Sequence, residues 1–289
     1  RGVVVNGQEK ILSPFVVLAV GHSARDTFKL LEEKKIPMEP KSFAVGLRAE
    51  HPQTLINRYQ YGKEDPGNLG AASYKLTHRG KNGRGIYSFC MCPGGYVVNA
   101  SSEPGRLAVN GMSYHDRDSQ NANSALIVTV TPEDFQGEGP LAGVEFQRRL
   151  EEKAYELGKG RIPLQLYGDF RRNRETDWLG RITPCTKGAW DFANLRKLFP
   201  EQINETLIEG IQAFGKIIPG FDREDMVLTG VESRTSSPVR ISRDGDFQSG
   251  IEGIYHCGEG AGYAGGITSA AMDGLKVGEA IVKKIRNLF

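Results

Sequence analysis

The stretch Gly253-Ile-Tyr-His-Cys-Gly-Glu-Gly-Ala-Gly-Tyr-Ala-Gly-Gly-Ile-Thr-Ser-Ala-Ala271 runs from a short apolar segment into a glycine-dense turn. Because glycine has no Cβ, backbone amides in such a turn can approach an anionic or electron-rich ligand closely. Within the turn, Gly260-x-Gly262-x-x-Gly265 has the spacing of the dinucleotide-binding fingerprint. The stretch therefore predicts a strand, a ligand-binding turn and a helix in immediate succession.

The position of this turn near the end of the sequence argues against a complete dinucleotide-binding unit. A dinucleotide fingerprint opens a βαβ unit, with an acidic residue about 20 positions later at the end of a second strand. Here only Gly266 to Phe289 follow, and apolar residues recur at helical spacing from Ile267 to Leu288. We therefore expect the turn to close a nucleotide-binding sheet rather than to open one.

The composition is that of an ordinary globular protein. The 289 residues are 39% hydrophobic and 25% charged, with a formal net charge of +2, which allows one large or two modest domains. This charge favours a small-molecule substrate over a nucleic-acid or membrane partner. The sequence shows no signal peptide and no long apolar span. Its four cysteines lack zinc-site spacing and suit a reducing, cytoplasmic location.

The first residues predict the beginning of an α/β arrangement. The sequence starts with Arg1 rather than methionine and enters an apolar run at once, so we expect a C-terminal fragment of a longer protein. Two short strands flank Asn6-Gly7, a strong hairpin signal. The run Pro14 to Gly21 predicts a strand buried on both faces, as in a parallel sheet. A helix is expected to follow it, reaching about Lys35.

The middle of the chain is predicted to be β-rich with helices. Strands are expected at 43–48, 86–92, 96–100, 126–130, 226–231 and 239–241, helices at 141–157 and 200–217, and an irregular stretch at 162–186. The sequence therefore predicts an α/β protein in which residues 1–38 and 246–289 are pieces of one nucleotide-binding domain. They would flank an inserted α+β substrate domain, residues 39–245.

Several segments resemble known flavoproteins. A strand followed by Leu18-Ala-Val-Gly21, and another followed by Cys257-Gly-Glu-Gly-Ala-Gly262, resemble the glutathione-reductase-type two-domain fold. A closer resemblance is to the bacterial NAD(FAD)-utilising dehydrogenase flavoproteins. Four segments carry it: Gly21–Thr27, Ser88–Gly95, Glu232–Arg240 and Gly258–Gly274.

The resemblance implies a FAD-dependent oxidoreductase of unknown substrate, with a hydride or electron pair passing through the flavin. It also implies a split FAD/NAD(P)-binding Rossmann-like domain, incomplete here because the N-terminal Gly-x-Gly-x-x-Gly unit is absent from the sequence. We therefore expect FAD in the longer protein and no FAD in this fragment. The residues give no support for a separate NAD(P)H site.

The resemblance also assigns cofactor-binding residues. The Glu259 carboxylate would accept hydrogen bonds from the ribityl or pyrophosphate region, or it caps local backbone amides instead. The helix that starts after Gly266 would direct its dipole at the flavin N1/C2 carbonyl, or it simply packs on the sheet. Gly21 ends a strand beside the cofactor or is a structural turn residue. The full set is Gly21, Gly258, Glu259, Gly260, Ala261, Gly265, Gly266 and Ile267.

Three residues are candidates for catalysis. Cys90 and Cys92 lie two apart in a predicted strand and would share a face, as a redox pair with flavin or as one nucleophile. The alternative is that both are small buried structural residues. The turn Pro93 to Gly95 lets the backbone approach something closely. Arg234 would clamp a substrate carboxylate or stabilise flavin negative charge, or it joins an internal network with Glu232.

A second function class stays open. The protein would be a flavin-dependent RNA-modifying or scaffold protein, with the middle domain as an interaction module. This function requires a basic face with exposed aromatic residues. The only basic run, Arg171 to Arg174, is either a solvated loop or a contact for an acidic ligand. The sequence predicts no metal site and no particular oligomeric state.

Overall fold

The computed structural model describes residues 2–287 in two compact units. Unit 1 comprises Arg1–Phe43, Val130–Phe146 and Arg234–Phe289, and unit 2 comprises Ala44–Thr129 and Gln147–Ser233. Arg1, Leu288 and Phe289 lie outside the described residues, including the last two positions of the predicted C-terminal helix. The domain borders expected after residues 38 and 245 stay predictions beside this division.

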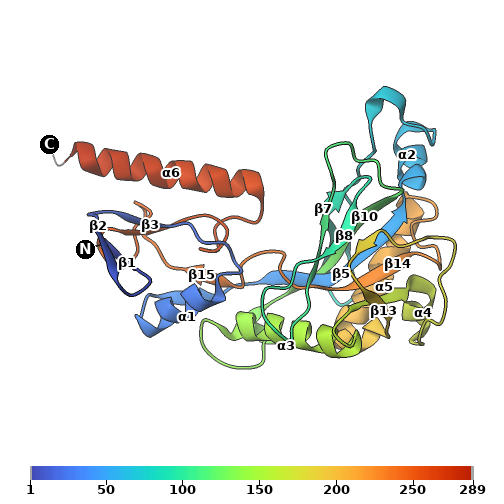
Figure 1. Cartoon of the computed structure of the whole chain (residues 1–289), viewed down its shortest axis with the longest axis horizontal. Coiled ribbons are helices and arrows are strands. Elements are labelled where there is room, and N and C mark those ends of the chain that lie inside the picture. The colour runs from blue at the N-terminus through green and yellow to red at the C-terminus, as the bar shows by residue number, and fades with distance from the viewer. Residues whose placement is uncertain (1, 288–289) are drawn as a thin grey trace. The chain divides into compact units, whose positions relative to one another are not determined.

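The described residues form a mixed α/β structure with six α-helices and a seven-stranded sheet (Figure 1). In unit 2 the strand order is β13-β11-β14-β5-β10-β7-β6. The central strands are buried along nearly their whole length. The bounds are β5 Phe43–Pro52, β6 Thr77–Arg79, β7 Gly85–Cys92, β10 Asn121–Val130, β11 Ile162–Leu166, β13 Trp190–Phe192 and β14 Val227–Glu232.

Helices and a small second sheet complete unit 2. Helix α5 (Glu201–Ile217) packs on β6 and β7, with its apolar residues buried at helical spacing. A three-stranded sheet, in the order β12-β8-β9, lies beside β7 and β14. Its strands are β8 Tyr96–Asn99, β9 Val109–Met112 and β12 Thr186–Lys187. The remaining helices that carry unit 2 residues are α2 Gln53–Tyr61, α3 Ala142–Leu157 and α4 Tyr167–Arg172.

The expectation of an irregular stretch at 162–186 is wrong at its start. Strand β11 lies inside the large sheet, parallel to β13 and antiparallel to β14, and α4 follows it directly. All five residues of β11 are buried, so no alternation of polar and apolar residues marks it. Pro163 argues against a central strand, and Gln165 is accommodated because its side chain bonds to Arg174 O and Leu195 N.

Unit 1 contains the predicted hairpin and a short parallel pair. Strands β1 (Gly2–Val5) and β2 (Glu9–Leu12) pair antiparallel, as Asn6-Gly7 predicts. Strand β3 (Val16–Leu18) pairs in parallel with β16 (Ile254–His256). Burial of β3 on both faces is not found, because Val17 is 44% exposed. In this two-stranded sheet, nothing described covers that face of the strand.

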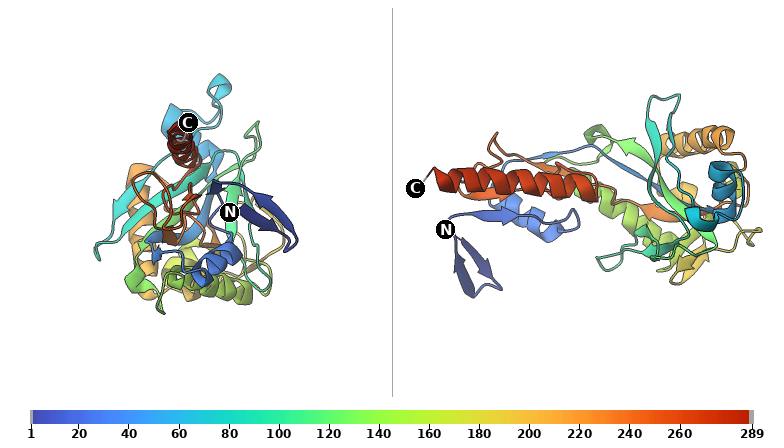
Figure 2. Two further views of the ribbon diagram at one scale, coloured as in Figure 1. Left: turned by 90° about the vertical axis from the view of Figure 1, so that its left-hand side faces the viewer. Right: turned by 90° about the horizontal axis from the view of Figure 1, so that it is seen from above.

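The other elements of unit 1 surround a compact apolar core. Helix α1 (Arg25–Glu33) confirms the helix expected after Gly21. Strand β4 (Met38–Pro40) pairs with β15 (Val239–Ile241). Helix α6 (Ile267–Arg286) is a single unbroken helix (Figure 2). The core consists of Phe28, Leu31, Ile36, Val144, Val239, Ile241 and Ala261.

A buried histidine in β5 makes the stability of the fold sensitive to acid. His51 is fully buried, with its Nε2 2.7 Å from Phe221 O and its ring centroid 4.1 Å from that of Phe221. Burial lowers the pKa of His51 from 6.5 to about 4. The unfolded chain therefore binds a proton below pH 6.5 that the folded chain does not bind until about pH 4.

We expect the free energy of unfolding to contain a histidine contribution that is complete above about pH 6.5 and is lost as pH falls towards 4. When the pH is lowered from 7 to 5, the free energy of unfolding of the His51→Phe variant should fall by about 2 kcal/mol less than that of the unmodified protein. Urea denaturation at both pH values measures this difference. Equal losses in the two proteins would contradict the assignment.

Candidate functional site

In the glycine-rich turn between β16 and α6, some positions need glycine because of their backbone conformation or because another part of the chain packs closely against them. Gly258 and Gly262 have φ values of +79° and +85°, in the left-handed region that favours glycine. A Cβ at Gly260 would collide with Val20 O, and one at Gly262 with Val239 O. Gly260 and Gly262 are therefore needed for the chain to pack on itself.

Two other glycines of this turn, Gly265 and Gly266, and Gly21 in the turn before α1 face open space. A Cβ at Gly21 or Gly265 would meet no atom within 4 Å, and one at Gly266 would meet only Ser269 Oγ at 3.9 Å. Ile267, the first residue of α6, is 93% exposed. The first amides of a helix have no intrahelical acceptor, so this helix start presents free N–H groups beside a glycine-lined opening. Such a helix start can bind an anionic or electron-rich group.

A buried ion pair fixes the turn to the helix. Arg243 donates two hydrogen bonds to Asp273 of α6, Nη1 to Oδ2 at 2.9 Å and Nη2 to Oδ1 at 2.6 Å. Asp273 Oδ2 also accepts from Gly258 N at 2.8 Å, while Arg243 Nη1 donates to His256 O. The hydrogen bonds from Arg243 lower the pKa of Asp273. The pair thus ties the strand, the turn and the helix together.

Sequence reasoning missed this ion pair, although a signal was present. Asp273 precedes Val277 by four residues, so it lies on the buried stripe of α6. An acidic residue on an apolar stripe requires a buried partner. That partner, Arg243, also places its guanidinium 3.6 Å from the centroid of the Tyr263 ring.

Several predicted residues come together near this turn in unit 1. Glu259 Oε2 lies 2.9 Å from His22 Nδ1, and both side chains are partly exposed, at 31% and 15%. Arg234 Nη1 donates to Ser23 Oγ at 3.3 Å, next to His22. The turn after Gly21, the Glu259 carboxylate and the Arg234 guanidinium are therefore neighbours. The carboxylate pairs with a histidine here, rather than capping backbone amides.

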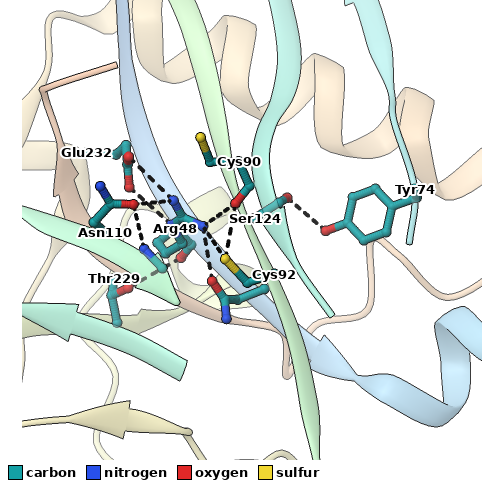
Figure 3. Close-up of polar contacts among 10 residues, drawn as sticks. Arg48, Tyr74, Cys90, Cys92, Asn110, Ser124, Thr229 and Glu232 are labelled. Carbon is teal, nitrogen blue, oxygen red and sulfur yellow. Dashed lines mark hydrogen bonds and ion pairs between the residues drawn. The ribbon is translucent and has the colours of Figure 1, made fainter. Parts of the chain in front are cut away.

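The predicted thiols lie in unit 2, around a buried arginine (Figure 3). The guanidinium of Arg48 is completely buried. Its Nε donates to Glu232 Oε2 at 3.0 Å, its Nη1 to Cys90 O at 2.8 Å and Asn123 Oδ1 at 3.0 Å, and its Nη2 to Asn110 Oδ1 at 3.0 Å. These partners come from four strands, β14, β7, β10 and β9, while Arg48 itself lies in β5.

The charges in this cluster stabilise each other. Burial disfavours the charged guanidinium, but the Glu232 carboxylate outweighs that effect and raises the pKa of Arg48. Burial also raises the pKa of the Cys92 thiol, and Arg48 opposes this only in part. Cys92 is therefore held as a neutral thiol near neutral pH.

The expectation that both thiols share a strand face is wrong, because β7 contains a bulge. The register with β10 shifts between Asn123 and Ala125, opposite Cys92 and Phe89, and Cys90 has a φ of +41°. A bulge interrupts the alternation of side chains. Cys90 is exposed, and its sulfur points away from the guanidinium, whereas Cys92 Sγ lies 3.9 Å from Arg48 Nη1 (Figure 3).

The turn after these cysteines makes the close approach that its glycines predict. Gly94 has a φ of +45°, and a Cβ there would collide with Arg117 O. Its amide donates to Gln53 Oε1 at 2.7 Å, and Ser113 Oγ donates to Pro93 O at 2.7 Å. The group that this turn approaches is therefore the chain's own backbone.

The basic run lies at the end of α4 and is neutralised by acidic neighbours. Arg171 and Arg172 pair with Glu224, and Arg174 pairs with Asp169 at 2.6 Å. Within residues 2–287, no group of three or more His, Cys, Asp or Glu side chains could hold a metal ion. No helix in the same range is long and apolar enough to cross a membrane.

The buried Arg48–Glu232 pair makes a sharp prediction about stability. Glu232→Gln leaves the buried guanidinium without its counter-charge and should lower the free energy of unfolding by about 3–5 kcal/mol. Arg48→Met/Glu232→Met should cost less than the sum of the two single changes. Urea denaturation of the unmodified protein, Glu232→Gln, the two single methionine variants and the double variant gives these values.

An exposed ion pair provides the matched control. Glu224, which is 57% exposed, pairs with Arg171 and Arg172, and Glu224→Gln should change the free energy of unfolding much less than Glu232→Gln, because solvent screens exposed pairs. If Glu232→Gln and Glu224→Gln lowered stability equally, the buried pair would not have the role assigned to it.

Comparisons with known proteins identify the family of the chain. A family profile described as "FAD-dependent protein, C-terminal domain-like" matches residues 42–235, which is more than half of the chain. An uncharacterized protein of Clostridium beijerinckii (strain ATCC 51743 / NCIMB 8052) is 52% identical over 289 residues. The match covers 98% of this chain and 54% of that protein, so the chain spans about half the length of its relative. The chain belongs to the family of FAD-dependent proteins that share this C-terminal domain.

Proposed function

We propose that the protein is a FAD-dependent oxidoreductase and that the open start of α6 contacts the flavin. Family membership supports the cofactor. The observation that carries the proposal is the free space beside Gly21, Gly265 and Gly266, at a helix end with unsatisfied amides. Bound FAD would accept a hydride or an electron pair from a small-molecule substrate.

The chain's own residues would bind and orient the cofactor. The amides of Ile267 and Thr268, with the positive end of the α6 dipole, would stabilise negative charge on the ring. The Glu259 carboxylate, held by His22 and partly exposed, is placed to accept hydrogen bonds from cofactor hydroxyl groups. Asp273 keeps the turn in place through its bond to Gly258 N.

The proposal includes a split Rossmann-like domain for unit 1. A parallel pair such as β3 and β16 normally belongs to a larger sheet covered on both faces. Helix α6 supports this idea because several of its apolar residues are exposed, namely Ile267, Met272, Leu275 and Val282. Further strands and helices of a nucleotide-binding domain would cover these surfaces.

Candidate roles for the remaining residues belong to the same proposal. Arg234 would bind a substrate carboxylate or stabilise negative charge. Cys90 and Cys92 would contact substrate or exchange electrons, with the exposed Cys90 the more accessible thiol. Four free cysteines favour a reducing compartment such as the cytosol. NAD(P)H is a possible electron donor to which the proposal assigns no residues.

The flavin proposal is tested at Gly266. Its φ of −163° is extended backbone that any residue adopts, and a Cβ there has room. Gly266→Val should therefore leave the fold intact but block close approach of the ring, reducing FAD affinity by about tenfold or more. The measurement is the flavin absorbance and FAD affinity of the protein purified with its complete natural sequence.

Gly245→Val is the matched control, because a Cβ at Gly245 also meets no atom within 4 Å. This variant should retain the flavin content of the unmodified protein. Equal FAD affinity in the Gly266 and Gly245 variants, with both folded by circular dichroism, would refute the site. A colourless protein that binds no added FAD would refute the function.

A further inference from the structure

A polar surface cavity in unit 2, open to solvent, is lined by none of the residues of the thiol cluster or of the flavin proposal. Its volume is about 460 Å³, within the usual range for small-molecule pockets. Three segments far apart in the sequence line it: Tyr96 at the start of β8, Asp118 to Gln120 before β10, and Pro184 to Lys187 at β12. The fold therefore brings these segments together around one space.

A buried carboxylate fixes one wall of this cavity. Glu50 is fully buried, and its Oε2 accepts from Cys185 N at 2.7 Å and from Asn121 Nδ2 at 3.0 Å. Its Oε1 accepts from Thr186 Oγ1 at 3.0 Å. Burying a carboxylate is costly unless hydrogen bonds compensate, and here two of the three donors belong to the cavity wall. The wall is thus held in one conformation before any ligand binds.

Two aromatic rings hold the cation of the cavity. Lys187 Nζ lies 4.4 Å from the centroid of the Tyr96 ring and 4.9 Å from that of Tyr114. It donates to Tyr114 Oη at 3.0 Å. An ammonium group has three donors, so two remain for a ligand. The rings restrict the lysine side chain, which lowers the entropy cost of binding.

The cavity also contains one negative charge, opposite in sign to Lys187. Among the described residues that line it, Lys187 is the only cation and Asp118 the only anion. Asp118 is exposed. A ligand with one negative and one positive group would therefore meet a complementary charge at each, whereas a simple anion would leave Asp118 uncompensated.

We propose that this cavity binds a small zwitterion of the amino-acid type, with its carboxylate at Lys187 and its ammonium at Asp118. Hydroxyl and amide groups of Ser119, Gln120 and Thr186 supply polar contacts around it. The Tyr96 ring offers an apolar face for the ligand's carbon skeleton. Binding at this cavity does not depend on the flavin.

The first experiment identifies the ligand class. The twenty common L-amino acids are titrated one by one into the 289-residue protein by saturation-transfer NMR, and those that bind are repeated as N-acetyl and C-amide derivatives. At least one amino acid should bind, and each derivative should bind about tenfold more weakly, since each lacks one charge. No binding across the panel would overturn the proposal. Equal binding of the acetylated form would show a carboxylate site and overturn the zwitterion.

The second experiment locates the site. Lys187→Met and Asp118→Asn should each lower the affinity for the amino acid that binds most tightly by about tenfold. Lys75→Met and Asp116→Asn, exposed residues that do not line the cavity, should leave affinity unchanged. All four side chains are exposed, so thermal unfolding should be unaffected. Affinity that falls equally in the control variants, or not at all in Lys187→Met, would place the ligand elsewhere.

Discussion

The buried ion pair between Arg48 and Glu232 is the constraint on which unit 2 depends. Its guanidinium connects the middle strand β5 to four other strands. A buried charge is tolerated only where its hydrogen bonds are satisfied, so the neighbouring backbone must adopt the conformation that supplies acceptors. The bulge at Cys90 is one result, because the carbonyl that it turns inward accepts from Arg48. Gly111 is another, since a Cβ there would collide with Arg48 Nη1.

Unit 1 also contains a buried ion pair that fixes the neighbouring backbone, although it joins fewer elements. Arg243 and Asp273 are buried together and hold the glycine-rich turn against α6 through Gly258 N. The turn is thereby rigid at Gly260 and Gly262, where the chain packs on itself, and open at Gly265 and Gly266. Each unit therefore contains a buried ion pair between an arginine and a carboxylate that also bonds to the neighbouring backbone. Preorganised polar groups of this kind need little rearrangement when a ligand binds.

The sequence predicts those parts of the fold that depend on local pattern. The hairpin at Asn6-Gly7, helix α5 and helix α6 follow from turn chemistry and helical spacing. Strand β11 could not be predicted, because its full burial removes the alternation of polar and apolar residues. The bulge at Cys90 could not be predicted either, because the group that it contacts, Arg48, lies 42 residues away in the sequence. At the candidate site, spacing draws attention to Gly260, Gly262 and Gly265, and the family resemblance adds Glu259 as a candidate. The sequence signals a buried charge at Asp273 but does not name its partner Arg243, because that partner is set by the tertiary fold.

Amide hydrogen exchange with and without FAD tests the central claim most directly, because it reports which backbone amides the cofactor covers. The protein with its complete natural sequence is compared in both states by mass spectrometry of its peptic peptides. The account predicts slower exchange on adding FAD in peptides that contain Gly21 to Ala24 and Gly265 to Ser269. It predicts no change around Arg48, whose hydrogen bonds are complete without a ligand. Protection that spares the start of α6 while FAD is bound would contradict the account.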